Sequence, residues 1–68
     1  MRNPLVEVTA WLRGNGERFM VFDCEPSGHC RVALHYTRTE GNDHQIIEGR
    51  GPTLDDALIM ALDQLRGA

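Results

Sequence analysis

The sequence lacks lysine and long apolar runs, and it has few aromatic residues and cysteines. All seven basic residues are arginines, and ten acidic residues outnumber them, which gives a formal charge of −3 at pH 7. An acidic balance argues against a domain that binds nucleic acid or a membrane surface mainly through electrostatic attraction. No apolar run approaches the ~18 residues that a membrane-spanning helix needs, so we expect no membrane contact.

The first residues do not form an export signal, because Met1–Glu7 has neither a long apolar segment nor a small-residue cleavage site. Cysteines in a chain without such a signal are usually reduced. We therefore expect a cytoplasmic protein in which Cys24 and Cys30 are free thiols. A disulfide between them is the alternative, and metal ligation is a third reading.

The 68 residues predict one small domain, 1–68, with an α+β fold. Thr53 is a suitable N-cap, and Asp55 and Asp56 place negative charge in the first helical turn. The sequence predicts a four-stranded antiparallel β-meander with one C-terminal α-helix packed on one face. We expect strands at about 5–13, 17–24, 30–38 and 44–49, and a helix at about 53–66 whose apolar stripe is Leu54, Leu58, Ala61, Leu62 and Leu65.

The turns between these strands set three registers that agree on one apolar face, because side chains alternate with a period of two. The registers pair Arg13 with Glu17, Cys24 with Cys30, and Tyr36 with Ile47, and the residues that then face the helix are Val6, Val8, Ala10, Met20, Phe22, Cys24, Cys30, Val32, Leu34, Tyr36 and Ile47.

The opposite face is mostly polar, but the same registers place Trp11 opposite Phe19 and His35 opposite Glu48. Exposed aromatic patches usually mark a partner surface, although a cross-strand aromatic pair can also serve only to stabilise a hairpin. The candidate partner-binding residues on this face are Trp11, Phe19, Val21, His35 and Ile46.

The predicted helix offers a second set of candidate contacts. Acidic side chains on it and in the turn before the last strand, at Glu40 and Asp43, would supply negative charge against a basic groove. A solvated face is the simpler reading of those acids. The helical candidates are Asp55, Asp56, Ile59, Met60 and Asp63.

Cys24, His29 and Cys30, followed by His35 and His44, are the residue types of a zinc site. The two cysteines are separated by five residues rather than two, and the register sends them to the face opposite His35. His29 and Cys30 are adjacent and would point to opposite faces of a strand, so they are poorly placed as a nucleophile and base. We expect no metal, no cofactor and no enzymatic activity.

The segment 49–53, Gly-Arg-Gly-Pro-Thr, precedes the predicted helix and invites comparison with a phosphate-binding loop. It lacks the required lysine, and Pro52 removes a backbone donor. We interpret it as a flexible connector between strand and helix.

Gly49-x-Gly51-x-Thr53, followed by Ala57 and Ala61, resembles the end of a double-stranded-RNA-binding domain. The resemblance implies a three-stranded sheet that leads into a final helix. That family places two lysines at the start of this helix, whereas this chain has other residues there, and we find no counterpart of the family's first helix. RNA binding is therefore not expected.

The helix start Thr53-Leu-Asp-Asp-Ala-Leu58 also resembles a junction in the antitoxin halves of small toxin–antitoxin pairs and in short phage proteins that inhibit host enzymes or defence complexes. We expect a non-catalytic protein-binding module, most similar to a phage-encoded inhibitor of the anti-CRISPR type, that blocks a surface of a larger complex. The alternatives are a homodimer, formed through the Trp11 and Phe19 face or an unpaired edge strand, and a weak nucleic-acid binder that uses Arg2, Arg13, Arg18, Arg31, Arg38 and Arg50.

Overall fold

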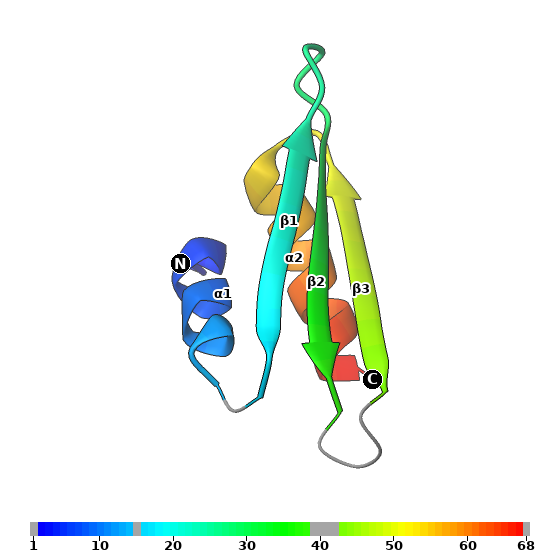
Figure 1. Ribbon diagram of the computed structural model, residues 1–68. Coiled ribbons are helices and arrows are strands. Elements are labelled where there is room, and N and C mark those ends of the chain that lie inside the picture. Colours follow the sequence, from blue (N-terminus) through cyan, green and yellow to red (C-terminus); the bar gives the residue numbers. More distant parts are fainter. Residues whose placement is uncertain (1, 15, 39–42, 68) are drawn as a thin grey trace.

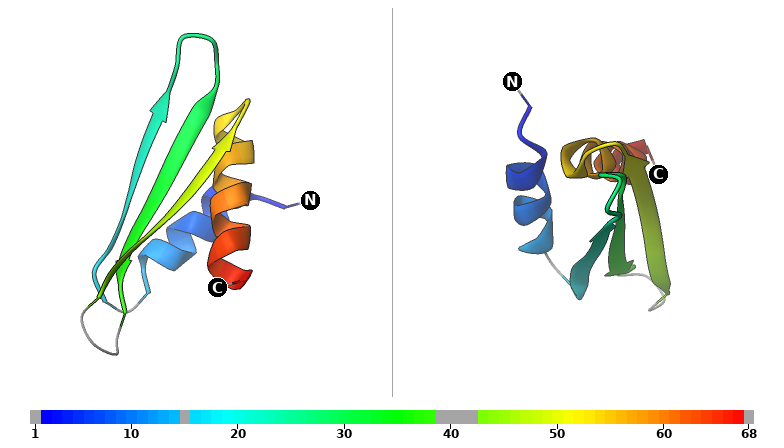
Figure 2. Two further views of the ribbon diagram at one scale, coloured as in Figure 1. Left: turned by 90° about the vertical axis from the view of Figure 1, so that its right-hand side faces the viewer. Right: turned by 90° about the horizontal axis from the view of Figure 1, so that it is seen from above.

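The computed structural model describes residues 2–14, 16–38 and 43–67. In chain order the elements are α1 (Pro4–Leu12), β1 (Arg18–Cys24), β2 (Cys30–Thr37), β3 (His44–Gly51) and α2 (Leu54–Gly67). The strands form an antiparallel sheet in the order β1-β2-β3, and both helices lie on one side of it (Figure 1, Figure 2). The expected α+β class and C-terminal helix are confirmed. The expectation of four strands and one helix is wrong, because the first segment is a helix.

Two local features of the sequence favour the start of a helix at α1, although the alternation of apolar and polar residues predicted a strand there. The side chain of Asn3 caps the helix by accepting a hydrogen bond from the Val6 amide at 3.3 Å, and Pro4 occupies the first turn, where its missing N–H costs nothing. Pro4 and Val8 are buried four residues apart, which is helical spacing. The predicted strand at 5–13 is therefore wrong. The helix α1 also precedes the sheet, where we expected no counterpart of the first helix of double-stranded-RNA-binding domains.

The register of the first hairpin in the sheet is the predicted one, with Cys24 opposite Cys30 and Phe22 opposite Val32. Between β2 and β3, Ile47 lies opposite Leu34 instead of Tyr36. This shift of two residues leaves each side chain on its predicted face. The predicted turn that sets this register, residues 40–43, falls mostly outside the described residues.

The core lies between α2 and the inner face of β2 and β3. The predicted apolar stripe of the helix packs there, and Thr53 caps the helix by accepting a hydrogen bond from the Asp56 amide at 3.2 Å. The buried hydrophobic residues are Val8, Cys30, Val32, Leu34, Ala57, Leu58, Ala61 and Leu62, with Trp11, Met20, Ile47, Leu54 and Leu65 packed against them.

Two glycines near the end of β3 determine how closely α2 approaches the sheet. Gly49 and Gly51 are both buried strand residues rather than parts of a flexible connector, which corrects that interpretation. A Cβ atom on Gly49 would overlap the Ala57 carbonyl oxygen and lie 2.6 Å from the Ala61 nitrogen. The small residues on both elements therefore allow helix and strand to pack in direct backbone contact.

Some residues expected in the core are exposed, either because they lie on the outward side of α1 or because the helices do not cover the inner face of β1 completely. Val6 and Ala10 lie on the outward side of α1. Phe22 points to the helix side of the sheet, opposite the buried Val32, yet it is 55% exposed. Cys24 is exposed as well.

Ion pairs join α1 to α2 across the helix layer. Arg2 contacts Glu7 at 2.7 Å and Asp63 at 2.9 Å, while Arg66 contacts the second oxygen of Glu7 at 2.5 Å. The hydrogen bond from Arg2, more than the one from Arg66, lowers the pKa of the Glu7 carboxyl. Across the described ranges, neither helix is both long and apolar enough to cross a membrane.

Candidate interaction surface on the open sheet face

The outer sheet face is the side of the sheet that carries no helix (Figure 2). Its members alternate with the buried inner residues along each strand and are paired by the observed registers. They are Phe19, Val21 and Asp23 on β1, Arg31, Ala33, His35 and Thr37 on β2, and His44, Ile46, Glu48 and Arg50 on β3.

The centre of the outer sheet face is apolar and accessible. Phe19 lies opposite His35, which in turn lies opposite Ile46, so one row crosses all three strands. Phe19 is 50% exposed, Val21 52% and Ile46 53%. Three large apolar side chains that are half exposed on one uncovered face form a patch of the kind found at protein interfaces.

Aromatic contacts hold this centre in a fixed arrangement. The ring of Phe19 stacks on that of His35, with 4.4 Å between centroids and 10° between planes. Nδ1 of His35 lies 3.0 Å from Nε2 of His44, so an N–H of one imidazole donates a hydrogen bond to the other. These contacts restrain the Phe19 and His35 rings, which therefore lose little conformational entropy when a partner binds.

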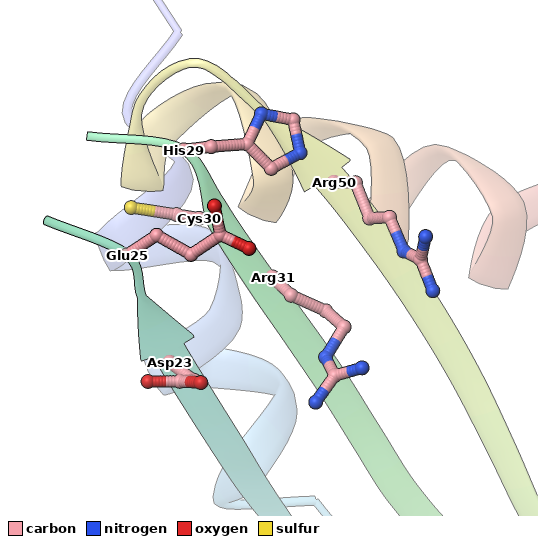
Figure 3. Close-up of a pocket in the computed structure, with 6 residues that line it drawn as sticks. All are labelled: Asp23, Glu25, His29, Cys30, Arg31 and Arg50. Atoms are coloured by element: carbon pink, nitrogen blue, oxygen red, sulfur yellow. The ribbon is translucent and has the colours of Figure 1, made fainter. Parts of the chain in front are cut away.

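One end of the outer sheet face is charged. Arg31 lies between Asp23 and Arg50 in the register, and a hollow of about 170 Å³ forms here together with Glu25, His29 and Cys30. Figure 3 shows the Arg31 and Arg50 side chains extending in the same direction, away from His29. Arg50 lies 3.9 Å from Glu48, whereas Arg31 pairs with no acid among the described residues.

The two cysteines form a disulfide, Cys24–Cys30, at the hairpin end of the sheet. The expectation of free thiols is therefore wrong, and the alternative of a cross-strand disulfide holds. In the described part of the chain, no three His, Cys, Asp or Glu side chains gather into a metal-binding group. A disulfide is typical of oxidising compartments, which weighs against the expected cytoplasmic location.

Of the residues predicted for partner binding on the sheet, four lie together on the outer sheet face: Phe19, Val21, His35 and Ile46. Trp11 does not, because it belongs to α1 on the other side of the sheet. It packs edge-on against Tyr36 at 6.0 Å, and the Arg18 guanidinium lies 5.0 Å from its ring centre. The predicted pairs of Trp11 with Phe19 and of His35 with Glu48 are both wrong.

The residues predicted on the helix lie in the helix layer, so they do not form one site with the sheet residues. Asp56 accepts a hydrogen bond from the Thr53 hydroxyl, and Asp63 pairs with Arg2, so both have roles within the fold. Met60 is 48% exposed. Asp55 is exposed and Ile59 is partly buried. Glu40 falls outside the described residues, and Asp43 is exposed just before β3.

The charged end of the surface, with Asp23, Arg31 and Arg50, was not among the residues predicted to bind a protein partner, although Arg31 and Arg50 were candidates for the nucleic-acid-binding alternative. The predicted β1–β2 register already placed Asp23 and Arg31 on the outer side. Arg50 was assigned to a loop, because the glycines around it were interpreted as a connector, so its place in β3 was missed.

No family model matches this chain, and no curated protein or solved structure matches it either.

Proposed function

We propose that this chain is a non-catalytic protein-binding module that covers a surface of a larger protein or complex, in the manner of small phage-encoded inhibitors such as anti-CRISPR proteins. The observation that carries the proposal is the apolar centre of the outer sheet face, where Phe19, Val21 and Ile46 are each about half exposed. Fully burying an apolar side chain of this size contributes ~1.5–3 kcal/mol, so covering the exposed half of each contributes about 1 kcal/mol.

The charged end of the face indicates the chemistry of the partner. Arg31 and Arg50 lie directly opposite each other, and like charges in that position destabilise a sheet. A carboxylate from a partner would relieve this repulsion and form bidentate hydrogen bonds with a guanidinium. The partner we propose therefore presents an apolar patch with an acidic group at one end.

The alternative of a nucleic-acid binder receives less support from the same face. Bases stack on free aromatic ring faces, whereas Phe19 and His35 cover one face of each other. The acidic net charge also disfavours it. Retention of the purified chain on single- or double-stranded nucleic acid that weakens with rising salt would favour this alternative.

The proposal is tested by affinity capture with the tagged wild-type chain and with the double variant Phe19→Ser/Ile46→Ser. The control is Met60→Ser, which removes an apolar residue that is 48% exposed and lies outside the outer sheet face. We expect a stoichiometric protein that the wild type and the control capture. The outer-face variant should bind it about thirty-fold more weakly, since it loses about 2 kcal/mol. Equal capture by all three chains would contradict the proposal.

The compartment of the target is a separate part of the proposal. A cytoplasmic target, which inhibitors of this type have, conflicts with the Cys24–Cys30 disulfide because cytoplasmic thiols are kept reduced. Alkylation of thiols in intact cells, followed by mass measurement of the chain, decides the question. Two alkylated cysteines place the chain in a reducing compartment, and none places it in an oxidising one.

A further inference from the structure

The two edges of the sheet differ, because side chains of α2 occupy the edge of β3. Nε2 of Gln64 donates to the Glu48 carbonyl at 2.8 Å, and the Arg50 amide donates to Sδ of Met60 at 3.4 Å. Unpaired backbone groups on an edge strand invite another strand to pair with them, and proteins commonly block them. The helix therefore protects part of the β3 edge from a second chain.

The edge formed by β1 has no such protection. At the hairpin end the Glu25 amide donates to the His29 carbonyl, so the odd-numbered residues of β1 bond to β2. The N–H and C=O groups of the even-numbered residues consequently lie in the plane of the sheet and point away from β2, toward the open edge. At the centre of this edge are Met20 and Phe22, and no described side chain or loop bonds to their backbone groups in that direction.

Two exposed apolar features lie on this same side of the molecule. Phe22 is exposed even though it points to the helix side of the sheet. The outward side of α1 carries a shallow hollow of about 300 Å³, where Leu5 is 55% exposed and Val6 62%. The helix α1 lies next to β1, on the side away from β3 (Figure 1). The Phe22 side chain projects, and the hollow on α1 is concave.

We propose that a second copy of this chain binds along the β1 edge, so that the two β1 strands pair antiparallel about a two-fold axis at Val21. The axis is perpendicular to the sheet, so both copies keep their helices on the same side and the two sheets become one. Met20 of each copy then lies opposite Phe22 of the other. Because α1 lies beside the first half of β1, each Phe22 projects toward the hollow on α1 of the other copy.

The register follows from the strand itself. Val21 is the midpoint of Arg18–Cys24, so only this register pairs the whole of β1 with its counterpart. A shift of two residues in one direction brings Glu17 opposite Asp23, and like charges in that position repel. A shift in the other direction leaves the first two residues of β1 without a strand partner.

A second copy fits this edge because the projecting Phe22 and the hollow on α1 belong to the same chain, so each copy offers both to the other. In a two-fold dimer each surface patch meets its own counterpart, and every contact occurs twice. A chain of 68 residues also buries a smaller share of its surface than a larger domain does, so covering Phe22 and α1 adds to a limited core.

The register is tested by cross-linking. In the proposed dimer Val21 lies opposite Val21 of the other copy as a non-hydrogen-bonded pair, where Cα atoms are ~4.5 Å apart and a disulfide can form. We expect Val21→Cys to give a covalent dimer under mild oxidation while the native disulfide stays intact. The control Phe19→Cys, on the same strand and face, lies about 13 Å along the strand from its counterpart and stays uncoupled. Equal coupling of both variants overturns the register.

Oligomeric state is tested by light scattering and sedimentation over a concentration series. We expect the mass of two chains for the wild type, with a dissociation constant at least tenfold higher in Phe22→Ser. A wild-type monomer at every concentration, or a dimer that Phe22→Ser leaves unchanged, overturns the proposal. Ile46→Ser should keep the dimer mass even if it loses a protein partner, so this dimer and the proposed function fail independently.

Discussion

The close contact between α2 and β3 predicts that Gly49→Ala destabilises the fold. The added methyl would meet backbone atoms of α2, namely the Ala57 carbonyl oxygen and the Ala61 nitrogen, which cannot rotate away as a side chain can. Overpacking of this kind costs ~1–3 kcal/mol. Reduced freedom of the unfolded chain offsets ~0.4–1 kcal/mol at best, and only where the residue fits. We expect a net loss of about 1–2 kcal/mol, which lowers the melting temperature by about 4–16 °C in a domain of this size.

The assay is thermal and urea unfolding followed by circular dichroism, with Gly67→Ala as the control. A methyl group on Gly67 meets nothing within 4 Å, so that variant should match the wild type or be slightly more stable. Gly51→Ala should fall between the two, because its nearest contact, the Asp56 Cβ at 2.6 Å, is also fixed to the α2 backbone but overlaps less than the contact at Gly49. If Gly49→Ala is as stable as Gly67→Ala, the helix does not lie against the strand as described.

Two further predictions concern the links that fasten the ends of the sheet and of the helix layer. The lowered pKa of Glu7 means that its charged form stabilises the folded state above the unfolded pKa, and that this contribution is lost as pH falls through the folded pKa. The urea midpoint of the wild type should therefore fall more steeply between pH 6 and 3 than that of Glu7→Gln, and parallel curves would refute the pairing with Arg2 and Arg66. Reduction of the Cys24–Cys30 disulfide, which spans a sequence separation of 6, should cost about 2 kcal/mol through loop-closure entropy. The midpoint with and without reductant measures this cost, and a Cys24→Ala/Cys30→Ala variant without a shift would refute it.

Features set by local spacing were predictable from the sequence. The helix α2 has one strong apolar stripe and a capping threonine, and β1 and β2 are joined by a short loop between two cysteines that fixes one register. Outward residues such as Phe19 and His35 followed from that register by alternation. Most residues of the candidate surface on the sheet could therefore be predicted from the sequence alone.

Features that depend on tertiary packing were not predictable in the same way. Residues 5–12 fit both periodicities, since valine and threonine favour strands while Pro4, Val8 and Trp11 follow a helical spacing. The N-cap at Asn3 was the deciding signal, and it was overlooked. The placement of Trp11 on the wrong face followed directly from this error. Gly49 and Gly51 were interpreted as flexible because only the packed helix explains why those positions lack side chains.

The position of Trp11 makes the protein's single tryptophan a natural reporter of one event, the docking of α1 on the sheet. Its ring contacts Tyr36 and Arg18 rather than the outer sheet face. Intrinsic fluorescence should therefore follow the release of α1 during unfolding, whereas far-ultraviolet dichroism averages over both helices and the sheet. If α1 detaches before the rest of the domain melts, the fluorescence transition will precede the dichroism transition. Coincident transitions would mean that the first helix, α2 and the sheet unfold as one cooperative unit.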